Sequence, residues 1–153
     1  MGGITPRALE DSVRARRLTR AFRRPLNFTV LDVSMQSFVS VFPQLAFVLA
    51  SELRATGRAD IARELEASTV KAVKFDSNVN VGSVVLEPPR KLNSVERNVI
   101  GQKLGQVIPF SRPHYASLQL DNFGRVIGVE LVAPPPGLAS ALRLTSNNRW
   151  SGP

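Results

Sequence analysis

Residues 115–132 read YASLQLDNFGRVIGVELV, two alternating stretches joined by a short polar segment. Successive side chains of a strand point to opposite faces, so alternation of apolar and polar residues indicates a half-buried strand. The joining segment, Asp121-Asn122-Phe123-Gly124, favours a tight turn because Asn and Gly tolerate positive φ. These features predict a hairpin with one apolar face, broken only by Arg125 beside the turn. On that face we expect Ala116, Leu118, Leu120, Ile127, Val129 and Leu131.

The same period of two extends upstream of the hairpin. Residues 70–75 and 79–86 are separated by the turn sequence Asp76-Ser77-Asn78, and Pro88-Pro89 ends the second stretch. Prolines are typical of strand ends because they cannot donate to the ladder. Weaker strand candidates are residues 95–100 and 106–110. Together these segments predict an antiparallel sheet of four to five strands.

A helical period precedes the sheet. After Ser34, a candidate N-cap, apolar residues recur at the i, i+3, i+4, i+7 spacing of a core-facing stripe. Pro43 lies inside this pattern and should kink the helix or begin a new one near Phe42. Gly57 would end it, and further helices are expected over residues 58–67 and 137–144. The stripe consists of Phe38, Val41, Phe42, Leu45, Val48, Leu49 and Leu53.

These patterns predict a single α+β domain over residues 31–145, with two core helices packed on the sheet. A short strand is also expected over residues 26–33. The length of 153 residues suits one domain with a hydrophobic core. We expect residues 1–30 to form a basic arm and residues 146–153 a polar tail.

The arm holds most of the net charge of +8. Residues 1–30 carry seven arginines against Glu10 and Asp11, which gives 7 − 2 = +5. Thr5-Pro6 can begin a basic helix, which Pro25 would end. The arm suits nucleic acid, an anionic membrane or an acidic protein, and a solvated surface helix explains it equally well. The candidate polyanion-binding residues are Arg14, Arg16, Arg17, Arg20, Arg23 and Arg24.

The sequence offers few groups for catalysis. There is no Cys and only one His, His114, so a thiolate or imidazole metal site is not expected. Phosphate-binding and nucleophile-elbow motifs are also missing from the sequence. We therefore predict a protein that is not an enzyme and has no cofactor, metal or catalytic residues. With no apolar run of about 20 residues and no signal peptide pattern, we expect a cytoplasmic protein without a membrane span.

Residues 73–132 resemble a family of short uncharacterised bacterial β-rich domains. The resemblance rests on an aromatic-Asp turn at Phe75-Asp76, on the strand that follows, and on the hairpin DNFGRVIGVE with Gly124, Gly128 and Glu130. The chain departs from the pattern at Asn78, at Asn80 and at Gly82-Ser83, and it has an insertion at residues 88–113. Members of this family are often suggested to be the neutralising half of a toxin–antitoxin or toxin–immunity pair.

The leading hypothesis is thus an immunity or antitoxin-like protein that neutralises a toxin by stoichiometric binding. The contact surface would include residues 79–86, the insertion and the hairpin, where Glu130 is expected to pair with Arg125 or Lys103. The alternatives are a nucleic-acid-binding accessory protein that uses the arm, and a structural subunit of a larger assembly. Candidate partner-binding residues are Tyr115, Gln119, Asp121, Phe123, Arg125 and Glu130.

Overall fold

The computed structural model describes residues 33–98 and 103–146. The predicted α+β class is confirmed, with a five-stranded antiparallel sheet. The basic arm, nearly all of the expected strand at 26–33 and most of the polar tail lie outside the described residues. In chain order the elements are α1 (Phe38–Val41), α2 (Pro43–Ala55), α3 (Ala59–Ala67), β1 (Thr69–Asp76), β2 (Val81–Glu87), α4 (Ser94–Arg97), β3 (Leu104–Pro109), β4 (Ala116–Asp121), β5 (Val126–Val132) and α5 (Pro136–Thr145).

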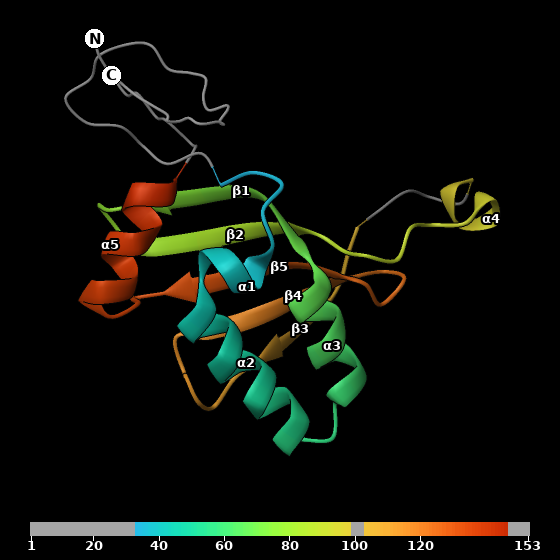
Figure 1. Ribbon diagram of the computed structural model, residues 1–153, viewed down its shortest axis with the longest axis horizontal. Coiled ribbons are helices and arrows are strands. Elements are labelled where there is room, and N and C mark those ends of the chain that lie inside the picture. Colours follow the sequence, from blue (N-terminus) through green and yellow to red (C-terminus); the bar gives the residue numbers. More distant parts are fainter. Residues whose placement is uncertain (1–32, 99–102, 147–153) are drawn as a thin grey trace, which may run out of the picture.

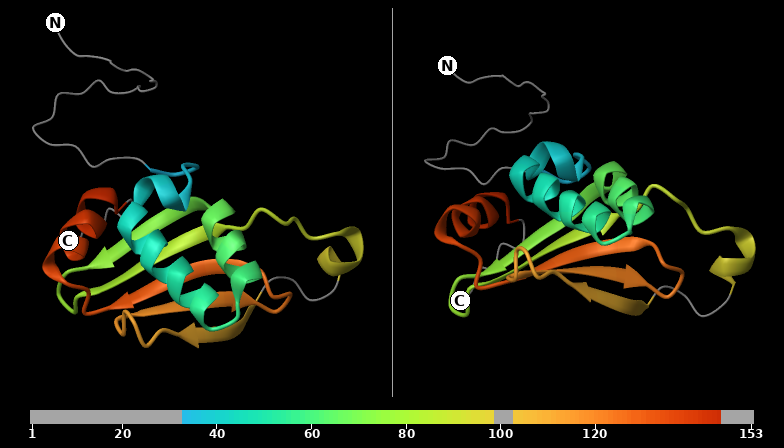
Figure 2. Two further views of the ribbon diagram at one scale, coloured as in Figure 1. Left: turned by 60° about the horizontal axis from the view of Figure 1, so that its bottom comes forward. Right: turned by 90° about the horizontal axis from the view of Figure 1, so that it is seen from below.

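The sheet has the order β1-β2-β5-β4-β3, with every neighbouring pair antiparallel. Helices α1, α2, α3 and α5 lie on one face of it (Figure 1). Seen edge-on in Figure 2, no described helix covers the opposite face, and α4 projects beyond the end of the sheet. An antiparallel sheet tolerates this arrangement, because alternate residues of each strand face the core on one side and water on the other.

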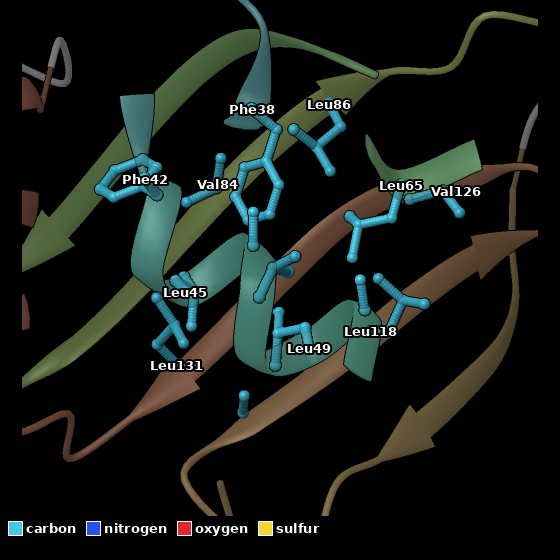
Figure 3. Packing of buried hydrophobic residues seen from close by; sticks show 14 of the residues in the cluster. Phe38, Phe42, Leu45, Leu49, Leu65, Val84, Leu86, Leu118, Val126 and Leu131 are labelled. Carbon is cyan, nitrogen blue, oxygen red and sulfur yellow. The ribbon is translucent and has the colours of Figure 1, made fainter. Parts of the chain in front are cut away.

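The core lies between the helices and the covered face of the sheet (Figure 3). Leu49 of α2 and Leu65 of α3 are fully buried against Val84, Leu118 and their neighbours on the strands. Each such side chain contributes about 1.5–3 kcal/mol by leaving water. The predicted stripe therefore supplies much of the core, except that Val48 is exposed, at 41%, and Val41 is only partly buried.

The two helices of this stripe are separate. Ser37, and not Ser34, caps α1, because its side chain accepts a hydrogen bond from the Ser40 backbone N–H at 3.1 Å. Phe42 then leaves helical geometry, and Pro43 begins α2 at its first position, where a missing N–H costs nothing. Gly57 adopts a φ of 84° just after α2, as expected for a helix end.

The strand expected over residues 95–100 is wrong in its described part. Residues 94–97 form α4, a single helical turn. A capping box stabilises the turn: the Glu96 N–H donates to Asn93 Oδ1 at 2.8 Å, and the Asn93 N–H donates to Glu96 Oε1 at 3.0 Å. This local pair outweighs the β-branched residues that favoured a strand.

The face assignment in β5 is also corrected at one residue. The register passes from Gln119↔Gly128 to Leu120↔Val126, so Ile127 is an extra residue in a β-bulge. Val126 therefore joins the core, and Ile127 turns to the uncovered face beside Gln119. Val129 and Leu131 keep the predicted inward direction.

Candidate functional site

The six predicted partner-binding residues do not share one surface. Asp121 and Arg125 are buried, at 2% and 6% exposure. Gln119 and Glu130 lie on the uncovered face of the sheet, since each pairs in register with residues of that face. Tyr115 lines a groove on the helical side, and Phe123 is partly exposed in the hairpin turn.

Asp121 and Arg125 have a role inside the hairpin, which removes them from the candidate contact surface. Arg125 Nε donates to Asp121 Oδ2 at 2.9 Å, and Asp121 Oδ1 accepts from the backbone N–H groups of Phe123 and Arg125 at 2.9 and 2.8 Å. Burial alone would raise the pKa of Asp121, but the hydrogen bonds from Arg125 and Phe123 outweigh it and hold that pKa below its usual value. The sequence predicts that Glu130 pairs with Arg125, but Arg125 forms its ion pair with Asp121.

Part of the insertion contacts the turn of the hairpin. Arg90 donates from Nη2 to the Phe123 carbonyl at 3.2 Å, and its own carbonyl accepts from Arg125 Nη1 at 3.0 Å. Arg90 Nη1 also contacts Glu96 Oε1 at 3.1 Å. The Asn93 backbone N–H, and then Arg90, lower the pKa of the Glu96 carboxyl. These contacts tie α4 to the turn of the β4–β5 hairpin.

We define the open sheet face as the uncovered surface of the five strands. Its central row runs Lys74, Ser83, Glu130, Ser117 and Pro109 across the sheet. Alongside this row the face is more apolar. It includes Ala72, Val81, Val85, Leu104, Val107, Gln119, Ile127 and Val132.

Three apolar side chains of the open sheet face are strongly exposed. Leu104, Val107 and Val132 retain 57%, 44% and 54% of their accessible surface. The sequence does not single them out, because Val107 and Val132 fit ordinary strand positions and Leu104 lies outside the strand expected over residues 106–110. A contiguous exposed apolar patch with a polar rim is typical of a protein-binding surface, whereas single exposed apolar side chains are common. Leu104 and Val107 are neighbours on β3, and Val132 lies two strands away, at the other end of the face from Leu104.

A hollow of about 270 Å³ lies in the open sheet face. Lys71 and Lys103 flank it, while Val85, Leu104 and Ile127 supply an apolar lining. The Lys71 ammonium is 3.7 Å from a Glu87 carboxylate oxygen. The hollow can accept an apolar side chain, with polar contacts from Gln119 and the lysines at its margin.

A second concave surface, the interhelical groove, lies on the helical side of the sheet. It has a volume of about 520 Å³. One wall is formed by residues 41–45 and 48, the other by residues 135, 137, 138 and 141 of the α5 region. Tyr115 also lines it, so this candidate residue faces a different surface from Gln119 and Glu130.

Among the described residues, no three His, Cys, Asp or Glu side chains are grouped to hold a metal ion. His114 is exposed and packs edge-on against Tyr115, with ring centroids 6.1 Å apart. Within the described ranges no helix is both long and apolar enough to cross a membrane. The six candidate arginines of the arm lie outside these ranges.

Comparison with known proteins adds no relative. No family model, no curated protein and no solved structure matches this chain. The family resemblance of residues 73–132 thus stays a prediction.

Proposed function

We propose that this chain is a non-catalytic binding protein of the immunity or antitoxin kind, which neutralises a toxin by covering it in a one-to-one complex. The observation that carries the proposal is the open sheet face, where Leu104, Val107 and Val132 expose apolar surface beside Gln119 and Glu130. A toxin contact would bury these side chains.

The physical case rests on the composition of this face. Protein interfaces combine an apolar centre with a polar rim and bury about 800 Å² on each partner. The open sheet face supplies apolar side chains from β2, β3 and β5, with polar side chains between them. It is also held rigidly, because the other face of the same strands forms the core. A rigid surface loses little conformational entropy when a partner binds.

The toxin as partner comes from the family resemblance. The matched hairpin supplies Glu130 from β5, and Gln119 of β4 lies just before the matched residues; both are on the open sheet face. The residues that match best are structural in part, since Asp121 is buried in the turn. We therefore assign Gln119 and Glu130, which are only half-buried, to the toxin contact.

A growth assay tests this function. The gene beside that of this chain is expressed alone and together with it, and we expect growth arrest in the first case and rescue in the second. Val107→Lys with Val132→Lys should abolish rescue, because the two lysines would be buried against the partner. Phe47→Lys is the matched control, since Phe47 is an exposed apolar residue, at 72%, on the helical side. No rescue by the wild-type chain, or full rescue by the double variant, contradicts the proposal.

The charge of the arm favours a second function, non-specific binding of nucleic acid. Its arginines would contact phosphates, with no base readout. For about six phosphate contacts, affinity should fall roughly a thousandfold between 50 and 200 mM salt. Removing residues 1–24 should abolish this binding, and unchanged affinity in the shortened chain rules the second function out.

A further inference from the structure

The interhelical groove is mainly apolar, and no Lys, Arg, His, Asp or Glu lines it. The residues that line it, all within the described part of the chain, include Val41, Leu45, Val48, Leu138 and Ala141, beside the polar Gln44 and Tyr115. Val41, Leu138 and Ala141 pack against the core from one side only and remain partly exposed. Contact with further apolar side chains would remove this surface from water.

The chain before Val33 is long enough to reach this groove. Val33 is buried, and Val41 at the start of the groove is eight residues later, so their Cα atoms are at most about 30 Å apart. The eleven residues from Phe22 to Val33 span up to about 36–40 Å when extended. A segment attached this closely has an effective concentration at the groove in the millimolar range. A separate partner of equal affinity would need a similar free concentration to compete with it.

The arm carries an apolar pair of suitable spacing. Leu18 and Phe22 are four residues apart and share one face of the helix expected there. At 3.6 residues per turn, Arg16, Arg20 and Arg23 fall on the opposite half of that helix. Leu9 and Val13 precede the pair by nine residues, about two and a half turns, and also lie on the far side.

We propose that residues 15–24 dock in the interhelical groove of their own chain, with Leu18 and Phe22 inserted between α2 and α5. The uncharged groove receives the apolar pair, and the arginines remain in water on the outer side of the docked segment. The groove is separate from the open sheet face, so this inference stands or falls independently of toxin binding.

The test uses the full chain, which contains no Cys and therefore accepts a single label. A nitroxide is attached to Gln44→Cys at the exposed rim of the groove, and broadening of the amide signals of residues 15–24 is measured by NMR. We expect strong broadening in the wild-type arm. The broadening should be lost in the variant that carries both Leu18→Ser and Phe22→Ser. It should persist in the matched control that carries both Leu9→Ser and Val13→Ser.

Two outcomes overturn the proposal. One is weak broadening of residues 15–24, or broadening that survives the Leu18→Ser and Phe22→Ser changes. The other is equal broadening in a mixture of labelled chains with unlabelled, isotope-enriched chains, which places the arm in the groove of a second copy.

Discussion

Arg125 and Asp121 form a buried ion pair across the turn of the β4–β5 hairpin, with Nε and Oδ2 2.9 Å apart. The pair is completed by the Arg90 carbonyl, which accepts from Arg125 Nη1 at 3.0 Å and lies 35 residues earlier in the chain. Removing either member of a buried ion pair strongly destabilises the fold, because the remaining charge stays buried without a partner. The hairpin turn and the insertion therefore depend on one another.

Arg125→Met should lower the free energy of unfolding by about 3–5 kcal/mol, because Asp121 would stay buried without its partner. Arg54→Met is the matched control, since Arg54 forms an exposed ion pair with Glu66 at 2.7 Å. Exposed pairs contribute little to stability, because water and salt screen both charges. Urea denaturation measures both variants, and equal losses would contradict the assignment.

Acid should destabilise the fold through Asp121. Its pKa is lowered on folding, so its contribution is complete above the unfolded-state pKa of about 3.9 and is lost as pH falls through the folded-state pKa. Asp121→Asn removes this titration. The stability of the variant should change less between pH 5 and pH 2 than that of the wild type, and parallel pH profiles would refute the role of this carboxyl.

Much of the fold follows from local pattern, and the departures have physical causes. The stripe that includes Leu45 and Leu49, and the alternation in β4, are local signals that packing reinforces. The bulge at Ile127 has no such signal, because register is decided by which side chains the neighbouring strands bury. Charged residues beside a turn usually face water, and the burial of Arg125 depends on Arg90, which only the tertiary structure brings near.

The candidate site was less predictable than the fold. Gln119 and Glu130 could be placed on one face by alternation, and the structure brings them there. The exposure of Val107 and Val132 depends on the absence of a described helix over that face, which no local pattern specifies.

Gly105→Ala should destabilise the protein by about 1–3 kcal/mol, although Gly105 is exposed. A Cβ there would lie 2.5 Å from the Asp121 carbonyl oxygen and 2.7 Å from the Asn122 Cα, and backbone atoms cannot rotate away. Gly137→Ala is the control, because nothing lies within 4 Å of its Cβ position in the first turn of α5. We expect a change within about 0.5 kcal/mol there, or a small gain. Thermal unfolding compares the two variants. An unchanged melting temperature for Gly105→Ala would contradict the close approach of the Gly105 and Asp121 backbones.

Leu49→Ala should cost about 2–5 kcal/mol, since Leu49 is fully buried in the core and its truncation leaves a cavity. Phe47→Ala, two residues earlier on the exposed side of α2, should change stability by about 0.5 kcal/mol or less. Urea denaturation distinguishes them. A larger loss for Phe47→Ala would mean that α2 presents its other face to the sheet.

The central claim is that the open sheet face binds a protein, and calorimetric titration with the product of the neighbouring gene tests it most directly. We predict one-to-one binding that weakens at least about a hundredfold, or roughly 2.7 kcal/mol, with Val107→Lys and Val132→Lys. Phe47→Lys should bind as the wild type does. Failure of the wild-type chain to bind, or equal affinity in the double variant, would contradict the account.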